Sequence, residues 1–242
     1  MKSLKSLIIT TSHNRLGDTN KKAGVWLEDL AAPYFILKDG GERITIASPQ
    51  GGLIPLDPNC QSIKGTTGNT VRFQQDTQAM YHFSHSLSLN EVKPQEFDLI
   101  FIAGGYGAMW DFSNNKRLQQ IIQHFNLLYR PIGLVGHAAV ALVSLIKDNG
   151  EPFVKGRKLT AFSDSEEYSG RFNEKAPFLL ESKLRSLGAL YSKGPDFKSY
   201  VVTDENMITG QNPASSVEVA KQLLSLAYSQ CRKEHVYINP SS

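Results

Sequence analysis

The sequence predicts an α/β protein with a mainly parallel β-sheet covered by helices on both faces. Short apolar runs typical of buried strands alternate with segments whose apolar residues recur at helical spacing. Paired glycines end two of these segments, at residues 40–41 and 104–105. Because no repeat, low-complexity tract or linker divides the chain, residues 1–230 are expected to form a single domain.

Each expected element follows from its own pattern. Apolar runs predict strands at residues 4–10, 43–47, 97–103 and 132–135, and a hairpin of residues 201–203 and 207–209. Helical periodicity predicts helices at residues 27–37, 118–128, 138–145, 177–187 and 215–227, the last opened by a Ser-x-x-Glu capping box. Residues 51–95 are expected to form an irregular inserted cap, and residues 231–242 a loose polar tail.

Composition excludes several classes of protein. The 242 residues are 40% hydrophobic with a formal net charge of +3, which excludes collagen-like, coiled-coil and disordered chains. So weak a charge gives no reason to expect nucleic acid or an anionic membrane as a partner. The longest apolar run, residues 132–146, is too short to span a membrane. Cys60 and Cys231 form no disulfide or zinc pattern, which favours a reducing, cytoplasmic location.

Glycine-rich turns follow two expected strands, where an open α/β sheet places its site. Residues 133–138 run from strand through sharp turn to helix, which is the layout of a nucleophile elbow, but Gly136 at the tip has no side chain. The same residues also fit an ordinary turn before a capped helix. The glycines of residues 104–107 are suited either to anion binding through backbone N–H groups or to a simple structural turn.

A proline marks the first expected helix. Pro33 removes the helical hydrogen bond to the carbonyl of Asp29 and bends the helix there. Such a bend costs roughly 3 kcal/mol, so a reason for it is expected. One reason would be to aim the carboxylate of Glu28 or Asp29 into a site. The alternative is a surface helix that ends early.

Acidic and histidine pairs supply the remaining candidates. Glu166 and Glu167 could orient an imidazole, or they could belong to a solvated loop. His82 and His85 share one helical face, but no third metal ligand follows at a recognisable spacing, so surface histidines are the favoured interpretation.

Seven segments together carry a family resemblance. They are residues 26–34 (WLEDLAAPY), 47–52 (ASPQGG), 55–58 (PLDP), 104–111 (GGYGAMWD), 135–137 (VGH), 162–167 (FSDSEE) and 208–216 (ITGQNPASS). In this order the chain resembles the ThiJ/PfpI superfamily, of the class I glutamine amidotransferase-like fold, and most closely its heat-shock chaperone and glyoxalase III branch. The resemblance covers roughly residues 4–229 and implies a flavodoxin-like sheet sandwiched by helices.

The resemblance also implies the site residues. The nucleophilic cysteine of the family falls on Gly136, the histidine after it on His137, and the early-helix glutamate on Asp29. The acid that orients the histidine falls on Glu167, and Tyr106 stands where the branch often has a histidine. The backbone groups implied for binding the substrate are those of Gly104, Gly105 and His137.

Because the nucleophile is absent, the resemblance implies a protein that has lost cysteine-dependent catalysis. Such a member would keep a pocket for a small carbonyl compound, or a chaperone or stress role. The alternative is an active glyoxalase III-like or hydrolase enzyme on small carbonyl compounds, for example converting methylglyoxal to lactate, with His137, Glu167 and Asp29 as acid and base. Either function would need no cofactor or metal, and the family implies a homodimer.

Overall fold

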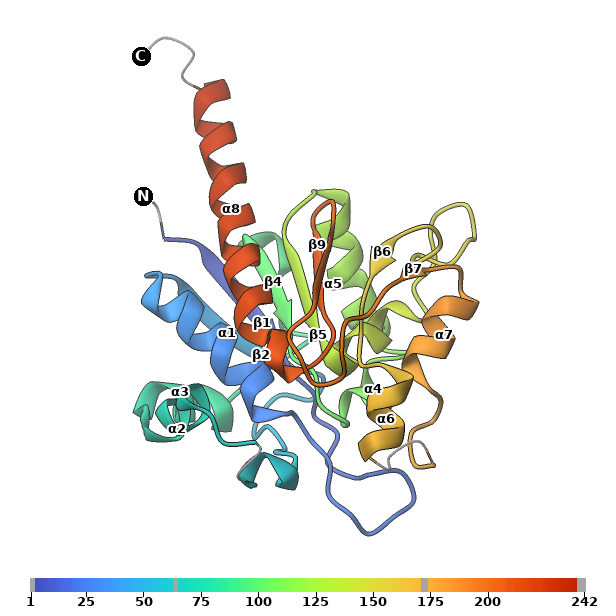
Figure 1. Ribbon diagram of the computed structural model, residues 1–242. Helices are drawn as coiled ribbons and strands as arrows, with labels where there is room; N and C mark the ends of the chain where they lie inside the picture. Colours follow the sequence, from blue (N-terminus) through green and yellow to red (C-terminus); the bar gives the residue numbers. More distant parts are fainter. Residues whose placement is uncertain (1–2, 63–64, 171–173, 239–242) are drawn as a thin grey trace.

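The computed structural model describes residues 3–62, 65–170 and 174–238 (Figure 1). In this part of the chain the main sheet has seven strands in the order β3-β2-β1-β4-β5-β9-β8. All neighbours are parallel except β8 and β9, which form the predicted hairpin. The strands are β1 (Lys5–Ile9), β2 (Arg43–Ser48), β3 (Leu87–Ser88), β4 (Leu99–Ile102), β5 (Ile132–Val135), β8 (Val201–Asp204) and β9 (Met207–Gly210). The predicted fold class is confirmed.

Helices cover both faces of this sheet (Figure 1). On one face α1 (Leu27–Asp39) packs with α8 (Ser216–Ile238), and Leu30 and Leu223 share a core cluster with Ile8 of β1. On the other face α5 (Lys116–Leu127) and the 3-10 helix η3 (Gly136–Leu142) build a second cluster around Phe125 and Ile100. The central strands are buried on both faces, which explains their continuous apolar runs.

Residues 51–95 differ from the predicted irregular cap. Thr67 opens one helix with a capping box, and the Asp76 carboxylate accepts from the Ala79 N–H to open the next. Asp76 also binds Lys38 of α1 at 2.7 Å. These side-chain caps organise residues 68–84 into helices, so the predicted irregular backbone is wrong there, while a role of the inserted segment as a cap stays a prediction. The elements of the segment are η1 (Pro58–Gln61), α2 (Gly68–Gln75), α3 (Thr77–Ser84), β3 and η2 (Pro94–Glu96).

The C-terminal part contains two further corrections. Ser215 lies in the 3-10 turn η4 (Pro213–Ser215), where its Oγ accepts from the Tyr200 N–H instead of capping α8. Helix α8 continues through Ile238, so the prediction of a loose tail is wrong for residues 231–238. Helix-forming residues such as Gln230 and Arg232 sustain these turns, which extend away from the sheet (Figure 1). Residues 239–242 lie outside the described residues.

The remaining elements line the second face and its edge. They are α4 (Ala108–Asp111), α6 (Asp164–Gly170), α7 (Leu180–Ser186) and a two-stranded parallel sheet of β6 (Lys158–Leu159) and β7 (Leu190–Tyr191). Helix α7 begins three residues after Pro177, later than predicted, and the helix expected at residues 138–145 is the 3-10 helix η3. None of the helices in the described ranges is both long enough and apolar enough to cross a membrane.

Candidate functional site

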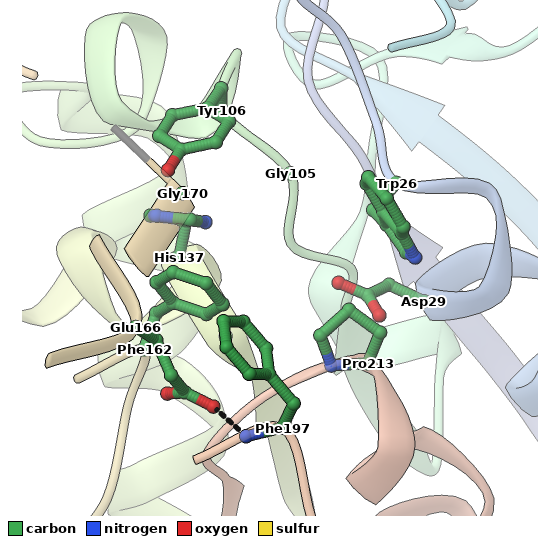
Figure 2. Close-up of a pocket in the computed structure, with 11 residues that line it drawn as sticks. Trp26, Asp29, Gly105, Tyr106, His137, Phe162, Glu166, Gly170, Phe197 and Pro213 are labelled. Carbon is green, nitrogen blue, oxygen red and sulfur yellow. Dashed lines mark hydrogen bonds between the residues drawn. The ribbon is translucent and has the colours of Figure 1, made fainter. Parts of the chain in front are cut away.

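A pocket of about 170 Å³ lies beyond the carboxyl ends of the central strands (Figure 2). The turns after β4 and β5 supply its glycines and Tyr106, the start of α1 supplies Asp29, and the segment before and within α6 supplies its acidic side. The lining residues are Trp26, Asp29, Gly105, Tyr106, Gly136, His137, Phe162, Glu166, Gly170, Phe197 and Pro213. The predicted candidates Gly136, His137 and Asp29 therefore meet in one cavity, as expected at this edge of the sheet.

Gly136 forms the turn between β5 and η3. Its φ is +58°, in the left-handed region that glycine adopts without steric cost. A Cβ added there would meet Asp29 Oδ2 at 3.7 Å, which is ordinary van der Waals contact. The position therefore has room for a small side chain, although its backbone conformation disfavours one.

His137, Glu167 and Tyr106 form a buried network on one wall of the pocket. His137 Nε2 lies 2.7 Å from Glu167 Oε1, and the Tyr106 hydroxyl donates to Glu167 Oε2. The Tyr106 and His137 rings lie 4.4 Å apart, and the tyrosine hydroxyl points toward the imidazole side of the pocket (Figure 2). Tyr106 is thus tied into the wall, and it leaves the cavity open.

The network keeps Glu167 ionised. Burial alone would raise the Glu167 pKa, but the His137 charge and the hydrogen bonds from His137 and Tyr106 outweigh it and lower the pKa below its usual range. An ionised Glu167 accepts from both partners, so the Nε2 nitrogen of His137 carries a proton. The sequence-based alternative of a solvated loop is wrong, because Glu166 and Glu167 are both fully buried.

Asp29 lies on the opposite wall of the pocket, and its pKa is raised where that of Glu167 is lowered. Burial raises its pKa from 3.8 to about 8; a hydrogen bond from Ser216 lowers it, the Glu28 charge raises it, and the Gly104 N–H lowers it. Ser216 Oγ donates to Asp29 Oδ1 at 2.9 Å, which leaves Oδ2 facing the space above Gly136. At neutral pH the acid form of Asp29 predominates, and an acid can donate a hydrogen bond into the pocket.

The structure also decides between the two carboxylates near Pro33. Pro33 lies inside α1, as expected, and Asp29 is the residue that reaches the pocket. Glu28 instead accepts hydrogen bonds from Asn69 Nδ2 at 2.9 Å and from the Thr67 hydroxyl. Since Glu28 is held by the segment before and within α2, it anchors that helix and takes no place in the pocket wall.

Close packing requires the two glycines after β4. A Cβ on Gly104 would lie 2.5 Å from the Val135 carbonyl oxygen, and one on Gly105 would lie 2.4 Å from the Trp26 nitrogen. Gly105 also has a φ of +113°. The turn therefore brings β4 against both the elbow and the start of α1, and substrate binding by its backbone N–H groups stays a prediction.

The aromatic walls were not predicted, and Glu166, a candidate to orient an imidazole, instead accepts from the Phe197 N–H. Trp26, Phe162 and Phe197 line the cavity, and Figure 2 shows Phe197 between Phe162 and Pro213. Trp26 and Phe162 stand in family-like segments, but nothing in their spacing marks a pocket.

The other sulfur and imidazole candidates lie outside the pocket. Cys60 is buried, its Sγ accepts from the Leu27 N–H at 3.1 Å, and burial raises the pKa of its thiol to about 12. The His82 ring packs against Tyr34 with centroids 6.0 Å apart, whereas His85 stacks on Tyr81. Among the described residues no group of three or more His, Cys, Asp or Glu could hold a metal ion.

Comparisons with known proteins identify the family. The model of the DJ-1/PfpI family matches residues 23–226. The chain belongs to this family. This DJ-1/PfpI chain is 27% identical over 237 residues to Glyoxalase 3 of Candida albicans, covering 92% of this chain and 98% of that protein. It is 26% identical over 216 residues to the glutathione-independent glyoxalase hsp3101 of Schizosaccharomyces pombe, covering 85% of this chain and 88% of that protein.

A solved structure resembles the whole fold. The X-ray structure of Francisella tularensis Rapid Encystment Protein 24 KDa matches with a TM-score of 0.88 and 34% identity, covering 93% of this chain and 99% of that chain. The family inferred from the seven sequence segments is therefore confirmed, as is the similarity to proteins named glyoxalases.

Proposed function

We propose that this DJ-1/PfpI-family protein binds small carbonyl compounds in the pocket above Gly136 and lacks the cysteine-dependent chemistry of the glyoxalase branch. The family's nucleophile position, carried over from the sequence, falls on Gly136. The observation that carries the proposal is a cavity bounded by Gly136, His137 and Asp29, with no cysteine among its described lining residues. Deletion of a nucleophile costs roughly 10⁶-fold in turnover in a serine protease, so no comparable catalysis is expected here.

Binding of a carbonyl group would use the acid form of Asp29. Its Oδ2 atom faces the space above Gly136, and a donor inside a cavity favours a carbonyl oxygen that has left water. Opposite it, His137 presents an imidazole ring fixed by Glu167. These two groups suit a neutral ligand held between a donor and an aromatic wall.

Neither thiol outside the pocket is suited to replace the missing nucleophile. A nucleophile must be a thiolate, and the Cys60 pKa of about 12 keeps that thiol protonated at neutral pH. Cys60 also does not line the cavity. Cys231 lies on α8, fifteen residues beyond Ser216 at the start of that helix, and it is not among the lining residues of the pocket.

The test combines turnover with binding. Purified protein incubated with methylglyoxal should form no lactate above a heat-denatured control, measured by ¹H NMR. Titration of ¹⁵N-labelled protein with acetone, a non-reacting ketone, should shift the amide resonances of Gly105 and His137. Lactate formation would contradict the loss of catalysis, and pocket resonances that neither acetone nor a larger ketone shifts would contradict carbonyl binding.

One observation favours a second function, an acid–base enzyme that needs no cysteine. The 2.7 Å contact between His137 Nε2 and Glu167 Oε1 fixes the imidazole as in general acid–base sites, and the acid form of Asp29 faces it. Such an enzyme would move a proton between adjacent carbons of a dicarbonyl hydrate. Lactate formation that His137→Ala abolishes and Cys60→Ser leaves unchanged would establish this alternative.

A further inference from the structure

Phe197 occupies a backbone conformation that bulky residues avoid. Its φ is +56°, and it is the third residue of a turn closed by the Lys198 N–H donating to the Pro195 carbonyl at 3.2 Å. Glycine or asparagine is favoured at such a position, and a phenylalanine there is strained. The ring is 51% exposed, so core packing does not account for this strain. Strain of this kind concentrates where a side chain has a binding role.

Glu166 holds the strained residue in place. Its Oε1 accepts from the Phe197 N–H at 2.7 Å, the contact drawn in Figure 2, and from Asn212 Nδ2 at 2.7 Å. Its Oε2 accepts from the Ser163 N–H at 3.0 Å and from the Ser163 hydroxyl at 2.8 Å. All of these donors are uncharged, so the fully buried carboxylate is satisfied by positioned dipoles, which fix the turn relative to α6.

The turn places the Phe197 ring at the pocket. The ring lies edge-on to Phe162, with centroids 6.3 Å apart, and lines both this cavity and a neighbouring one of about 400 Å³. Trp26 and Pro213 also line both cavities, so these three residues form the partition between them. Phe197 is therefore the most exposed part of an aromatic wall whose other members, Trp26 and Phe162, are half-buried.

Size and charge indicate what the pocket accepts. A dry apolar cavity of about 150 Å³ holds a benzene ring, and this pocket has about 170 Å³. Among its described lining residues none is a lysine or arginine, and Asp29 and Glu166 are acidic. An anionic ligand would lose its hydration without gaining a cationic partner. A ketone carrying only methyl groups would leave much of the aromatic wall without contacts.

We propose that the pocket selects uncharged carbonyl compounds that carry a flat apolar group such as a phenyl ring, and that Phe197, positioned by Glu166, sets this preference. The proposal rests on the proposed function, because it assumes that a carbonyl compound binds above Gly136. It adds the ligand class and the residue that determines specificity.

Three probes of matched chemistry test the proposal by NMR titration of ¹⁵N-labelled protein. They are acetophenone, acetone and benzoate. Acetophenone should bind at least about 10-fold more tightly than acetone, because the phenyl ring buries more apolar surface than a methyl group. It should also bind at least about 10-fold more tightly than benzoate, which has the same ring and a negative charge.

Three variants test whether Phe197 and Glu166 determine the preference for acetophenone over acetone. Phe197→Ala should reduce the ratio of acetophenone to acetone affinity to about 3-fold or less, because the lost ring contacts a phenyl group over a larger apolar surface than a methyl group. Tyr129→Ala is the matched control: Tyr129 also has a positive φ of 53° and is 61% exposed, but it does not line the pocket, so the ratio should not change. Glu166→Gln should shift the Phe197 amide resonance and lower the ratio in the same direction.

The outcomes separate the two proposals. If wild-type protein binds acetone and acetophenone equally, or if Phe197→Ala keeps the wild-type ratio, the specificity inference is wrong and carbonyl binding stands. If benzoate binds as tightly as acetophenone, selection against charge is wrong. If none of the three probes shifts the pocket resonances, the proposed function fails and the inference fails with it.

Discussion

Two buried carboxyl groups lie on opposite walls of the pocket and differ in protonation. Glu167 is fully buried yet ionised, because His137 and Tyr106 contact its two oxygens. Asp29 is 1% exposed and has no cationic partner within the part of the chain that the structure describes, so its pKa rises to about 8. Burial raises the pKa of both carboxyl groups, so their different protonation states come from the hydrogen-bond partners and charges beside them. The pocket thus combines an imidazole held by a carboxylate with a neutral acid, which suits an uncharged ligand.

Removal of the Glu167 carboxylate should cause the largest loss of stability. Glu167→Ala leaves the His137 ring and the Tyr106 hydroxyl without their buried acceptor, and we expect a loss of about 3–5 kcal/mol in free energy of unfolding. Urea denaturation at pH 7 measures this. Glu151→Ala is the control, because Glu151 forms an exposed pair with Lys155, and little change is expected there. A loss as small in Glu167→Ala as in the control would contradict the network.

The raised pKa of Asp29 should make the free energy of unfolding depend on pH. Between its unfolded pKa of 3.8 and its folded pKa of about 8, the folded protein keeps a proton that the unfolded chain has released. The free energy of unfolding therefore falls as pH rises, by as much as about 1.4 kcal/mol per pH unit. Asp29→Asn removes this contribution. Its stability relative to wild type should rise by on the order of 3 kcal/mol between pH 5 and pH 8.

The two walls should have opposite pH dependence. The lowered pKa of Glu167 contributes stability above its unfolded pKa of 4.5, and this stability is lost as pH falls through the folded value. Relative to wild type, Glu167→Gln should therefore lose stability as pH rises from the folded pKa of Glu167 to 4.5, whereas Asp29→Asn should gain stability as pH rises from 3.8 to about 8. Parallel curves for Asp29→Asn and wild type would show that Asp29 is ionised in the folded protein.

Substitution of two turn glycines of the pocket, Gly105 and Gly136, should lower the free energy of unfolding by different amounts. Gly105→Ala places a Cβ 2.4 Å from the Trp26 nitrogen, and we expect a loss of about 3 kcal/mol in free energy of unfolding. Gly136→Ala meets no atom closer than 3.7 Å, so only backbone strain remains, at about 1–2 kcal/mol. Thermal melts of both variants give the comparison. Equal losses would mean that the elbow is as tightly packed as the Gly105 turn.

The sheet could be predicted from the sequence because the spacing of apolar residues follows directly from which side chains are buried. The strands and the helices at residues 27–37 and 118–128 appear close to their expected bounds. Helices α2 and α3 were not predicted, because each begins at a side-chain cap, Thr67 or Asp76, that acts through single hydrogen bonds. The composition of the segment, rich in polar residues, gave no sign of these bonds. The site candidates Gly136, His137 and Asp29 came together because the family order of segments placed them at one edge of the sheet.

Other parts of the site could not be predicted from one sequence. Phe197 reaches the pocket through a positive φ and the hydrogen bond from its N–H to Glu166, and neither depends on a recognisable motif at residue 197. A partial signal exists in Ser163-x-x-Glu166, a capping-box spacing at the start of α6. The preference of Asp29 for its acid form depends on three-dimensional burial, which spacing does not record.

Gly136→Cys tests most directly whether Gly136 occupies the position of the missing nucleophile. The introduced side chain has room beside Asp29, and a thiol next to His137 favours the thiolate form. Iodoacetamide labelling followed by mass spectrometry should show the introduced thiol reacting faster than Cys60 and Cys231, and the variant should gain weak lactate formation from methylglyoxal that Asp29→Glu increases. If the introduced thiol reacts no faster than an exposed model thiol and wild-type protein already forms lactate, the assignment of Gly136 and the proposed loss of catalysis are both contradicted.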